Sequence, residues 1–201
     1  MVIVAVGAHP DDIEFGCYGT LAKLRKNHEI HFIVFTSGEI CGLKLERQKE
    51  AEASAKLIDA ELNILNYRDG HIPVDSESVK DLAEAVNSLK PSMVFTLFPH
   101  DTHQDHRAAS AITLSACRYV PSVLFYEIPH TNTGFLPNYY VDVTDSFPLK
   151  EKALACFKSQ ADKPYLKSSD VRALAQHRAY TVFHSGRLFE AFVLHHHIHE
   201  V

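Results

Sequence analysis

Hydrophobic and polar positions follow two different periods along the chain, and their alternation predicts a repeating order of strands and helices. Short runs rich in β-branched and aromatic residues are each followed by a stretch in which apolar residues recur every three or four positions. The third helical stretch is the clearest, because Val79, Leu82, Ala83, Val86 and Leu89 form one apolar stripe. The predicted strands are 2–8, 30–36, 62–67, 93–98, 122–126 and 188–195, and the predicted helices are 15–27, 46–58, 79–89, 107–117, 147–159 and 169–180.

The predicted strands contain few polar residues, which is typical of a sheet covered by helices on both faces. We therefore predict one domain over residues 1–201 with a three-layer α/β/α fold, built on a mostly parallel sheet of Rossmann-like type. The expected order of the first four strands is 3-2-1-4. The segment 129–138 is rich in Pro, Gly, Asn and Thr, and we expect it to be a functional loop.

Composition narrows the classes of protein that fit. The 201 residues, of which 46% are hydrophobic and 22% charged, can bury one core. The four cysteines form no Cys-x-x-Cys pair, so we expect reduced thiols and a cytoplasmic protein. No apolar run is long enough to insert in a membrane. The net charge of −5 and the lack of a basic stripe argue against nucleic acid as a partner.

Two short polar motifs follow predicted strands and contain the candidate chemistry. His-Pro-Asp-Asp at 9–12 follows the first strand, and His-Gln-Asp-His at 103–106 follows the fourth. If these strands are neighbours, both motifs flank the switch point at which open α/β sheets hold ligands. We predict that His9, Asp12 and His106 form a site for one metal ion, with a position left open for water.

Asp11 lies beside this ligand set without belonging to it, and a metal hydrolase needs its general base at such a place. A second interpretation makes Asp11 and Asp12 N-caps of a helix and leaves His103 and His106 on a helix surface. The position of both motifs directly after buried strands favours the metal site.

The two motifs also carry a family resemblance. Ala-His-Pro-Asp-Asp-Ile-Glu-Phe-Gly at 8–16, with Pro-x-Asp-x-His-x-Asp-His at 99–106, resembles the LmbE-like or PIG-L family of zinc-dependent N-acetylglucosaminyl deacetylases, which includes enzymes of the bacillithiol and mycothiol pathways. Similar pieces extend over nearly the whole chain: Arg47, Asp69-Gly70, Val141 to Thr144, Ser159-Gln160 and Glu190 to Phe192.

The resemblance implies one Zn²⁺ per chain, held by three residues, with three more in catalysis. The implied ligands are His9, Asp12 and His106, and the implied catalytic residues are Asp11 as general base, His103 as oxyanion stabiliser and Asp105 orienting His103. The chemistry is consistent, since zinc activates water and polarises a carbonyl while a nearby carboxylate moves the proton. An acid at a helix N-terminus explains Asp105 almost equally well.

Substrate contacts are expected at Arg47 and in the loop after the fifth strand. Arg47 meets the substrate by the resemblance, and its planar fork suits a carboxylate, a phosphate or a pair of sugar hydroxyls. Alternatively, Arg47 is exposed to solvent and forms an ion pair with Glu50. His130 and Asn132 can line the sugar pocket, or they can simply form turns.

Three further features bear on the pocket and on partners. Tyr18 stands where many relatives have a glycine, and we expect its bulk near the site. The chain is short for this family, so we expect a pocket completed by a second copy, and hence a homo-oligomer. The alternating His195, His197 and His199 can face solvent or another subunit and can bind metal adventitiously.

We therefore expect a zinc-dependent hydrolase of C–N amide bonds that removes the acetyl group from a GlcNAc-containing small molecule. One alternative is another metal-dependent hydrolase, for example of a phosphate ester. A non-catalytic metal- or sugar-binding module is the other. The presence of Asp11 argues against such a module, because binding requires the ligands but not the base.

Overall fold

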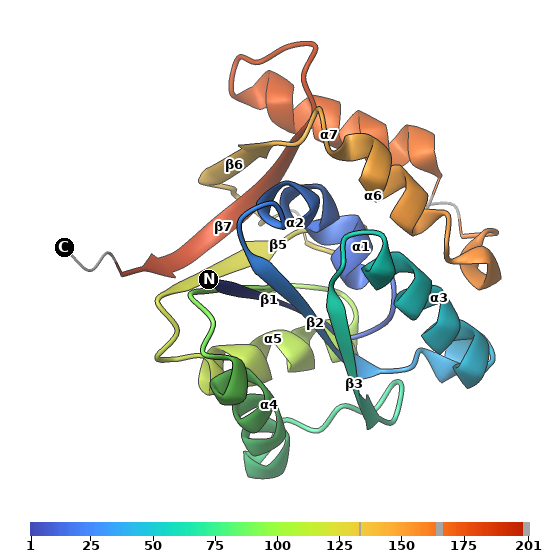
Figure 1. Cartoon of the computed structure of the whole chain (residues 1–201), viewed down its shortest axis with the longest axis vertical. Coiled ribbons are helices and arrows are strands. Elements are labelled where there is room, and N and C mark those ends of the chain that lie inside the picture. The colour runs from blue at the N-terminus through green and yellow to red at the C-terminus, as the bar shows by residue number, and fades with distance from the viewer. Residues whose placement is uncertain (133, 164–166, 199–201) are drawn as a thin grey trace.

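One mixed sheet runs through the part of the chain that the computed structural model describes, residues 1–132, 134–163 and 167–198 (Figure 1). Its strand order is β3-β2-β1-β4-β5-β7-β6. The first five strands are parallel, and β7 is antiparallel to both of its neighbours. The strands are β1 (Val2–Gly7), β2 (Glu29–Thr36), β3 (Glu61–Tyr67), β4 (Met93–Leu97), β5 (Ser122–Tyr126), β6 (Tyr139–Asp142) and β7 (Phe189–His197).

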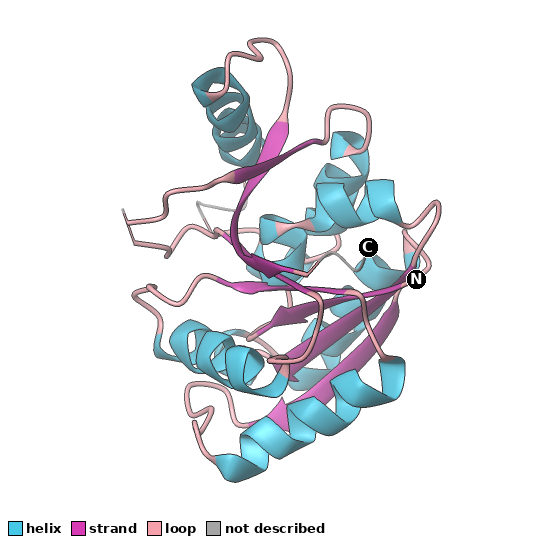
Figure 2. Cartoon of the chain, turned by 90° about the vertical axis from the view of Figure 1, so that its left-hand side faces the viewer, coloured by secondary structure: helices cyan, strands magenta, loops and turns pink. Residues whose placement is uncertain are grey.

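Helices cover both faces of this sheet (Figure 2). Helices α4 and α5 pack together on one face, α1, α2, α3 and α6 form the layer on the other, and α7 packs against β7. The described helices are α1 (Asp12–Gly16), α2 (Tyr18–Leu24), α3 (Lys44–Lys56), α4 (Ser76–Leu89), α5 (Gln104–Ala116), α6 (Phe147–Leu154) and α7 (Ser168–Thr181), with 3₁₀ turns η1 (Glu39–Cys41) and η2 (Lys158–Gln160). None of them is long and apolar enough to cross a membrane.

The single-domain α/β fold and the predicted strand order are confirmed. Strand β1 lies between β2 and β4, so Val4, Ala5 and Val6 are fully buried between the two helical layers. Helix α4 also has a well-defined start, where the Asp75 side chain accepts two backbone N–H groups. This packing fixes the carboxyl ends of β1 and β4 side by side.

The first helix differs from its prediction. The sequence predicts one helix over 15–27, but the chain forms α1 and α2 with a break at Cys17, whose backbone angles are φ −141° and ψ 7°. The reason lies in distant residues, because Lys150 donates to the Phe15 carbonyl while Glu190 accepts two N–H groups in the first turn of α2. Apolar periodicity continues across the break and cannot reveal it.

The edge strand β6 is absent from the predicted elements. It has only four residues and is half-exposed, so it lacks the apolar run that marks a buried strand.

The helix predicted over 147–159 ends early, at Leu154, before η2 begins. Strand β7 carries a bulge opposite β5, where Val123 pairs with His196 and Leu124 pairs with Leu194.

Candidate metal and catalytic site

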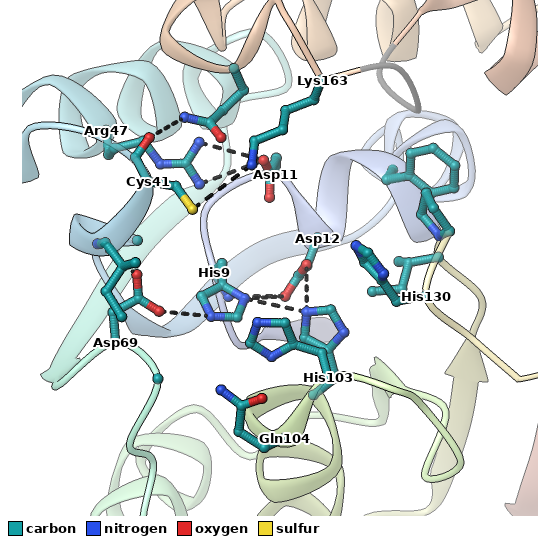
Figure 3. A pocket seen from close by; sticks show the side chains of 18 residues that line it. His9, Asp11, Asp12, Cys41, Arg47, Asp69, His103, Gln104, His130 and Lys163 are labelled. Atoms are coloured by element: carbon teal, nitrogen blue, oxygen red, sulfur yellow. Dashed lines mark hydrogen bonds and ion pairs between the residues drawn. The ribbon is translucent and has the colours of Figure 1, made fainter.

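Both polar motifs lie at the carboxyl ends of the adjacent parallel strands β1 and β4. His9 lies in the turn after β1, and Asp12 begins α1. His103 is the N-cap of α5, and His106 lies in the first turn of that helix. Figure 3 shows that His9, Asp12 and His103 converge on one cavity, which His106 also lines. Residues about a hundred positions apart in sequence are thus brought together by the sheet order.

Side-chain atoms of His9, Asp12 and His106 lie close together, with a different Asp12 oxygen near each imidazole. The His106 Nε2 atom lies 3.3 Å from His9 Nδ1 and 3.5 Å from Asp12 Oδ1, and the His9 Nδ1 atom lies 3.8 Å from Asp12 Oδ2. A tetrahedral ion with bonds of 2.0–2.2 Å separates its ligand atoms by roughly 3.3–3.6 Å. The two separations from His106 Nε2 lie within this range, and the one between His9 and Asp12 is slightly longer, so the group suits one Zn²⁺-sized ion after a small movement of Asp12.

Three carboxylates contact the outer nitrogens of the two imidazoles, on the side away from the candidate metal site. His9 Nε2 lies 3.1 Å from Asp69 Oδ1 and 3.3 Å from Asp105 Oδ2, and His106 Nδ1 lies 3.2 Å from Asp101 Oδ1. A carboxylate in this position holds the proton on the outer nitrogen and leaves the inner nitrogen free to bind a metal. Sequence reasoning gave no role to Asp69 or Asp101, although both lie within the pieces that carry the family resemblance.

The Asp105 side chain does not reach the residue it is expected to orient. Its carboxylate contacts His9 and accepts the Gly70 N–H at 2.7 Å, while only its backbone N–H donates to His103 Nδ1, at 3.2 Å. Asp105 is thus a helix N-terminal acid and also a partner of a candidate ligand. Sequence spacing alone cannot distinguish His9 from His103 as its partner.

The electrostatics of the site favour a cation. Burial lowers the pKa of His9, but its hydrogen bonds to Asp105 and Asp69 outweigh burial and raise that pKa to about 10. Burial raises the pKa of the Asp69 and Asp105 carboxyl groups, yet their contacts with His9 hold each pKa below its usual range. A site that stabilises positive charge on His9 also attracts a metal ion to that imidazole.

Two other groupings of possible ligands share His9. His103 lies close enough to His9 and His106 to form a three-imidazole group. However, the His103 ring is stacked on His106 with an interplanar angle of 23° and a centroid distance of 4.5 Å, so their in-plane lone pairs run side by side instead of meeting. The second grouping, His9 with Asp69 and Asp105, lies on the outer nitrogen of His9. We therefore favour His9, Asp12 and His106.

Asp11 adopts a backbone conformation that side-chain-bearing residues seldom take. Its φ is 101° and its ψ is −22°, a strained combination of the kind found at functional sites. Its carboxylate faces the cavity beside Asp12 (Figure 3). Burial raises the pKa of Asp11 to about 6, against the opposing effect of the Arg47 guanidinium. A carboxyl group with this pKa can both accept and release a proton near neutral pH.

The cavity has a volume of about 270 Å³ and lies between the two motifs and the segment around η1. His130 lines it, with its ring centroid 6.0 Å from that of His106, as does Arg47. Asn132 and Tyr18 are not among the lining residues; the Tyr18 hydroxyl donates to the Ser54 carbonyl in the core. Cys41, Gln160 and Lys163 are among the residues of the cavity wall to which sequence reasoning gave no role.

The remaining alternatives from the sequence can be placed as well. Arg47 is buried and contacts Asp11, whereas Glu50 accepts the backbone N–H and hydroxyl of Ser159, so the solvated Arg47–Glu50 pair is wrong. The C-terminal histidines have separate partners: His196 contacts the Val120 carbonyl, His197 contacts Ser122, and His195 lies against Phe125. His199 lies outside the described residues.

A two-histidine, one-carboxylate set with a separate carboxylate beside it is typical of metal-dependent hydrolases. The family model described as "PIG-L: GlcNAc-PI de-N-acetylase" matches residues 4–117, and the chain belongs to this PIG-L or LmbE-like family. The matched range includes both polar motifs and ends at the C-terminus of α5.

Individual proteins show the same similarity. The chain is 34% identical over 169 residues to "Uncharacterized deacetylase YaiS" of Escherichia coli K12, covering 78% of this chain and 90% of that protein. The structure of N,N'-diacetylchitobiose deacetylase from Pyrococcus horikoshii with an inhibitor has 27% identity and a TM-score of 0.82, covering 96% and 83% of the two chains. The structure of GalB, a 4-carboxy-2-hydroxymuconate hydratase from Pseudomonas putida, has 19% identity and a TM-score of 0.87, covering 100% and 98%, and shows the shared fold alone.

Proposed function

We propose that this protein is a zinc-dependent hydrolase that removes the acetyl group from the amine of a GlcNAc-containing small molecule. The observation that carries the proposal is the convergence of His9, Asp12 and His106 beside the separate carboxylate of Asp11. Membership of a family described as a de-N-acetylase, and relatives named deacetylases, support amide hydrolysis of an N-acetylated sugar.

Zinc held by His9, Asp12 and His106 would polarise the acetamide carbonyl and activate a water molecule at neutral pH. Asp11 accepts the proton of that water and delivers it to the departing amine, which is a poor leaving group until it is protonated. The pKa of about 6 for Asp11 suits both steps. Its position next to Asp12, but outside the ligand set, leaves its carboxylate available for this transfer.

His103 is placed to stabilise the developing oxyanion. Its Nδ1 atom accepts the N–H of Asp105, so the proton of the neutral ring is on Nε2. Burial, with His106 and His9 nearby, lowers the pKa of His103, which keeps this ring neutral. A fixed N–H donor in a site sheltered from water is the usual means of stabilising such charge.

The cavity supports a small acetamido sugar as the group that is bound. Its volume of about 270 Å³ is at the lower end for ligand pockets, which suits one sugar ring better than a larger glycan. We place His130 next to the sugar, since it lines the cavity beside the ligand set, with its ring centroid 6.0 Å from that of His106. The contact between Arg47 and substrate stays a prediction, as does the second copy of the chain.

A phosphate-ester hydrolase is the alternative within the metal-dependent enzymes. Two-metal sites place their ions about 3.5–4 Å apart and need two ligand sets. Here the second possible set would share His9 with the first, so the two sets do not have separate ligands. This geometry favours a single ion and therefore acyl transfer.

Two measurements on one preparation test the proposal: zinc content, and release of free amine from a panel of N-acetylated sugars. The wild type should contain about one zinc per chain and release amine, and His106→Ala should lose both properties. His177→Ala, which removes an exposed histidine of α7 that does not line the cavity, is the matched control and should keep both. Unchanged zinc in His106→Ala would refute the ligand assignment. A zinc-loaded wild type that releases phosphate from esters but no amine would replace deacetylation with the alternative.

A further inference from the structure

Arg178 lies in the last turn of α7 and contacts both flanks of the segment that carries His130. Its guanidinium donates to both carboxylate oxygens of Glu127, with the Nε atom 2.6 Å from Oε1 and the Nη2 atom bound to Oε2. The same guanidinium lies over the ring of Phe135, 5.4 Å from its centroid. Glu127 comes shortly before His130 in the sequence, and Phe135 comes shortly after it. One side chain of α7 therefore holds this segment at two points.

Both of these contacts are largely shielded from water. The side chains of Arg178 and Glu127 are only 15% and 13% exposed. Two hydrogen bonds between a guanidinium and a carboxylate fix the distance and also the orientation of the two groups. Phe135 is buried and packs edge-on against Phe98, with the ring centroids 5.1 Å apart. The two contacts of Arg178 are thus part of a packed region and not of a loose surface.

The backbone of the same segment is hydrogen-bonded to the turn after β4. The Thr102 N–H donates to the His130 carbonyl at 3.1 Å, and the Asn132 N–H donates to the His100 carbonyl at 3.1 Å. That turn has its own support, because Arg107 of α5 donates to two of its carbonyls, at 2.8 and 2.9 Å. The segment with His130 therefore lies between a turn that α5 holds and the Arg178 side chain of α7.

A second arginine of α7 makes similar contacts away from the cavity. The Nη2 atom of Arg172 donates to both oxygens of Glu151, at 2.9 and 2.8 Å, and its guanidinium lies over the Phe147 ring, 4.9 Å from the centroid. Glu151 and Phe147 belong to α6, and none of these three residues lines the cavity. Arg172 is thus a matched comparison for Arg178, with the difference that its partners do not flank His130.

We propose that Arg178 is a positioning residue for His130: it holds the segment 127–132 in the place where the His130 imidazole forms part of the cavity wall. This inference rests on the proposed function, in which His130 lies next to the sugar (Figure 3). A side chain on a loop makes a precise contact only when packing and hydrogen bonds fix the loop itself. Arg178 does not line the cavity, so it acts on the affinity for the sugar through His130.

The kinetic constants of Arg178→Met and Arg172→Met test this role, because each variant removes one guanidinium from α7. Arg178→Met should raise KM for an N-acetylated sugar roughly three- to tenfold, the equivalent of one lost hydrogen bond, with kcat and zinc content little changed. Arg172→Met should leave KM unchanged. In a His130→Ala background, Arg178→Met should raise KM no further. Equal KM values for the two arginine variants, or the same rise in KM without the His130 imidazole, would overturn the inference.

A double variant separates positioning from stability. Arg178→Met leaves the Glu127 carboxylate largely buried without its cation, so this variant should also lose stability. Arg178→Met/Glu127→Met removes both charges and should recover the urea midpoint, because apolar side chains often replace a buried ion pair without loss. Its KM should stay raised, since the hydrogen bonds that orient the segment are still absent. A KM that returns to the wild-type value together with stability would show that Arg178 only stabilises the fold. The double variant keeps this test available if Arg178→Met alone does not fold.

Amide hydrogen exchange distinguishes failure of the inference from failure of the proposed function, since it follows local opening without any substrate. The N–H groups of Thr102 and Asn132 should exchange about tenfold faster or more in Arg178→Met/Glu127→Met than in wild type, while the N–H groups of β1 keep their wild-type rates. This increase should be present even if wild type releases amine from no sugar, in which case only the function fails. Unchanged exchange, with wild-type deacetylation intact, would remove Arg178 from the positioning of His130 and leave the function standing.

Discussion

Lys150→Met is expected to destabilise the fold strongly, because it breaks a buried ion pair next to the candidate site. Lys150 and Glu190 are 4% and 5% exposed. The Lys150 ammonium donates to Glu190 Oε1 at 2.6 Å and also to the Phe15 carbonyl, at the C-terminal end of α1. Methionine has a similar volume, so the substitution removes the charge and both hydrogen bonds while leaving little cavity.

The size of the effect follows from what remains bound to Glu190. Removal of one partner of a buried pair costs about 3–5 kcal/mol, since the other charge is left uncompensated. Glu190 keeps the N–H groups of Gly19 and Thr20, at 2.9 and 2.7 Å, and these donors stabilise the remaining carboxylate. We therefore expect a loss near the lower limit, about 3 kcal/mol. For a domain with a stability of about 5–15 kcal/mol, that is a large fraction.

Urea unfolding of wild type, Lys150→Met and the double variant Lys150→Met/Glu190→Gln measures this loss. The double variant should recover part of it, because the neutral amide oxygen still accepts a backbone N–H but carries no buried charge. Arg187→Met removes one member of the more exposed Arg187–Asp142 pair and should cost no more than about 1 kcal/mol. A loss below about 1 kcal/mol for Lys150→Met, or no recovery in the double variant, would refute the reasoning.

Three further predictions concern the site. Asp11→Asn should retain zinc while kcat falls by about 10²–10⁴-fold, as measured by metal analysis and amine release on one sample, and loss of zinc would instead make Asp11 a ligand. Asp105→Asn should weaken zinc affinity about 10–100-fold in a chelator competition, because it removes a carboxylate behind His9, and unchanged affinity would contradict this role. Lys163 lines the cavity, and no carboxylate of the described residues lies within 4.0 Å of its ammonium group. Lys163→Met should therefore raise KM about tenfold or more for sugars with an acidic aglycone, and KM for neutral sugars should not change.

The sequence predicts the strands and helices of the parallel part well, because each element has its own local pattern of apolar and polar residues. The strands of the parallel part are continuous apolar runs, and each helix between them has its own periodicity. The place of β1 between β2 and β4 follows from the expected doubly wound order. The short edge strand β6 and the break at Cys17 depend on distant partners, so no local pattern in the sequence predicts them.

The candidate site likewise has residues that the sequence predicts and contacts that it does not predict. Two motifs of adjacent residues predict that His9, Asp12 and His106 lie together, because adjacent parallel strands bring their carboxyl ends to the same edge of the sheet. The contacts behind these residues cannot be read in advance: the Asp105 carboxylate reaches His9 because the turns after β1 and β4 meet at a particular angle. The same holds for Arg47, whose burial results from the fit of the 38–42 segment around it.

The place of β7 in the sheet has a consequence for the order in which the protein can be completed during synthesis. This strand is the last of the seven in sequence, yet it lies between β5 and β6, and its Glu190 binds Gly19 across 171 residues. Helices α1 and α2 are made well before their anchor, because Glu190 follows Gly19 by 171 residues. At about 5–20 residues per second, the wait is roughly 10–35 s. During that interval the turn after β1 lacks its final support, so a nascent chain would have to keep its apolar first helices covered by other means until β7 joins the sheet.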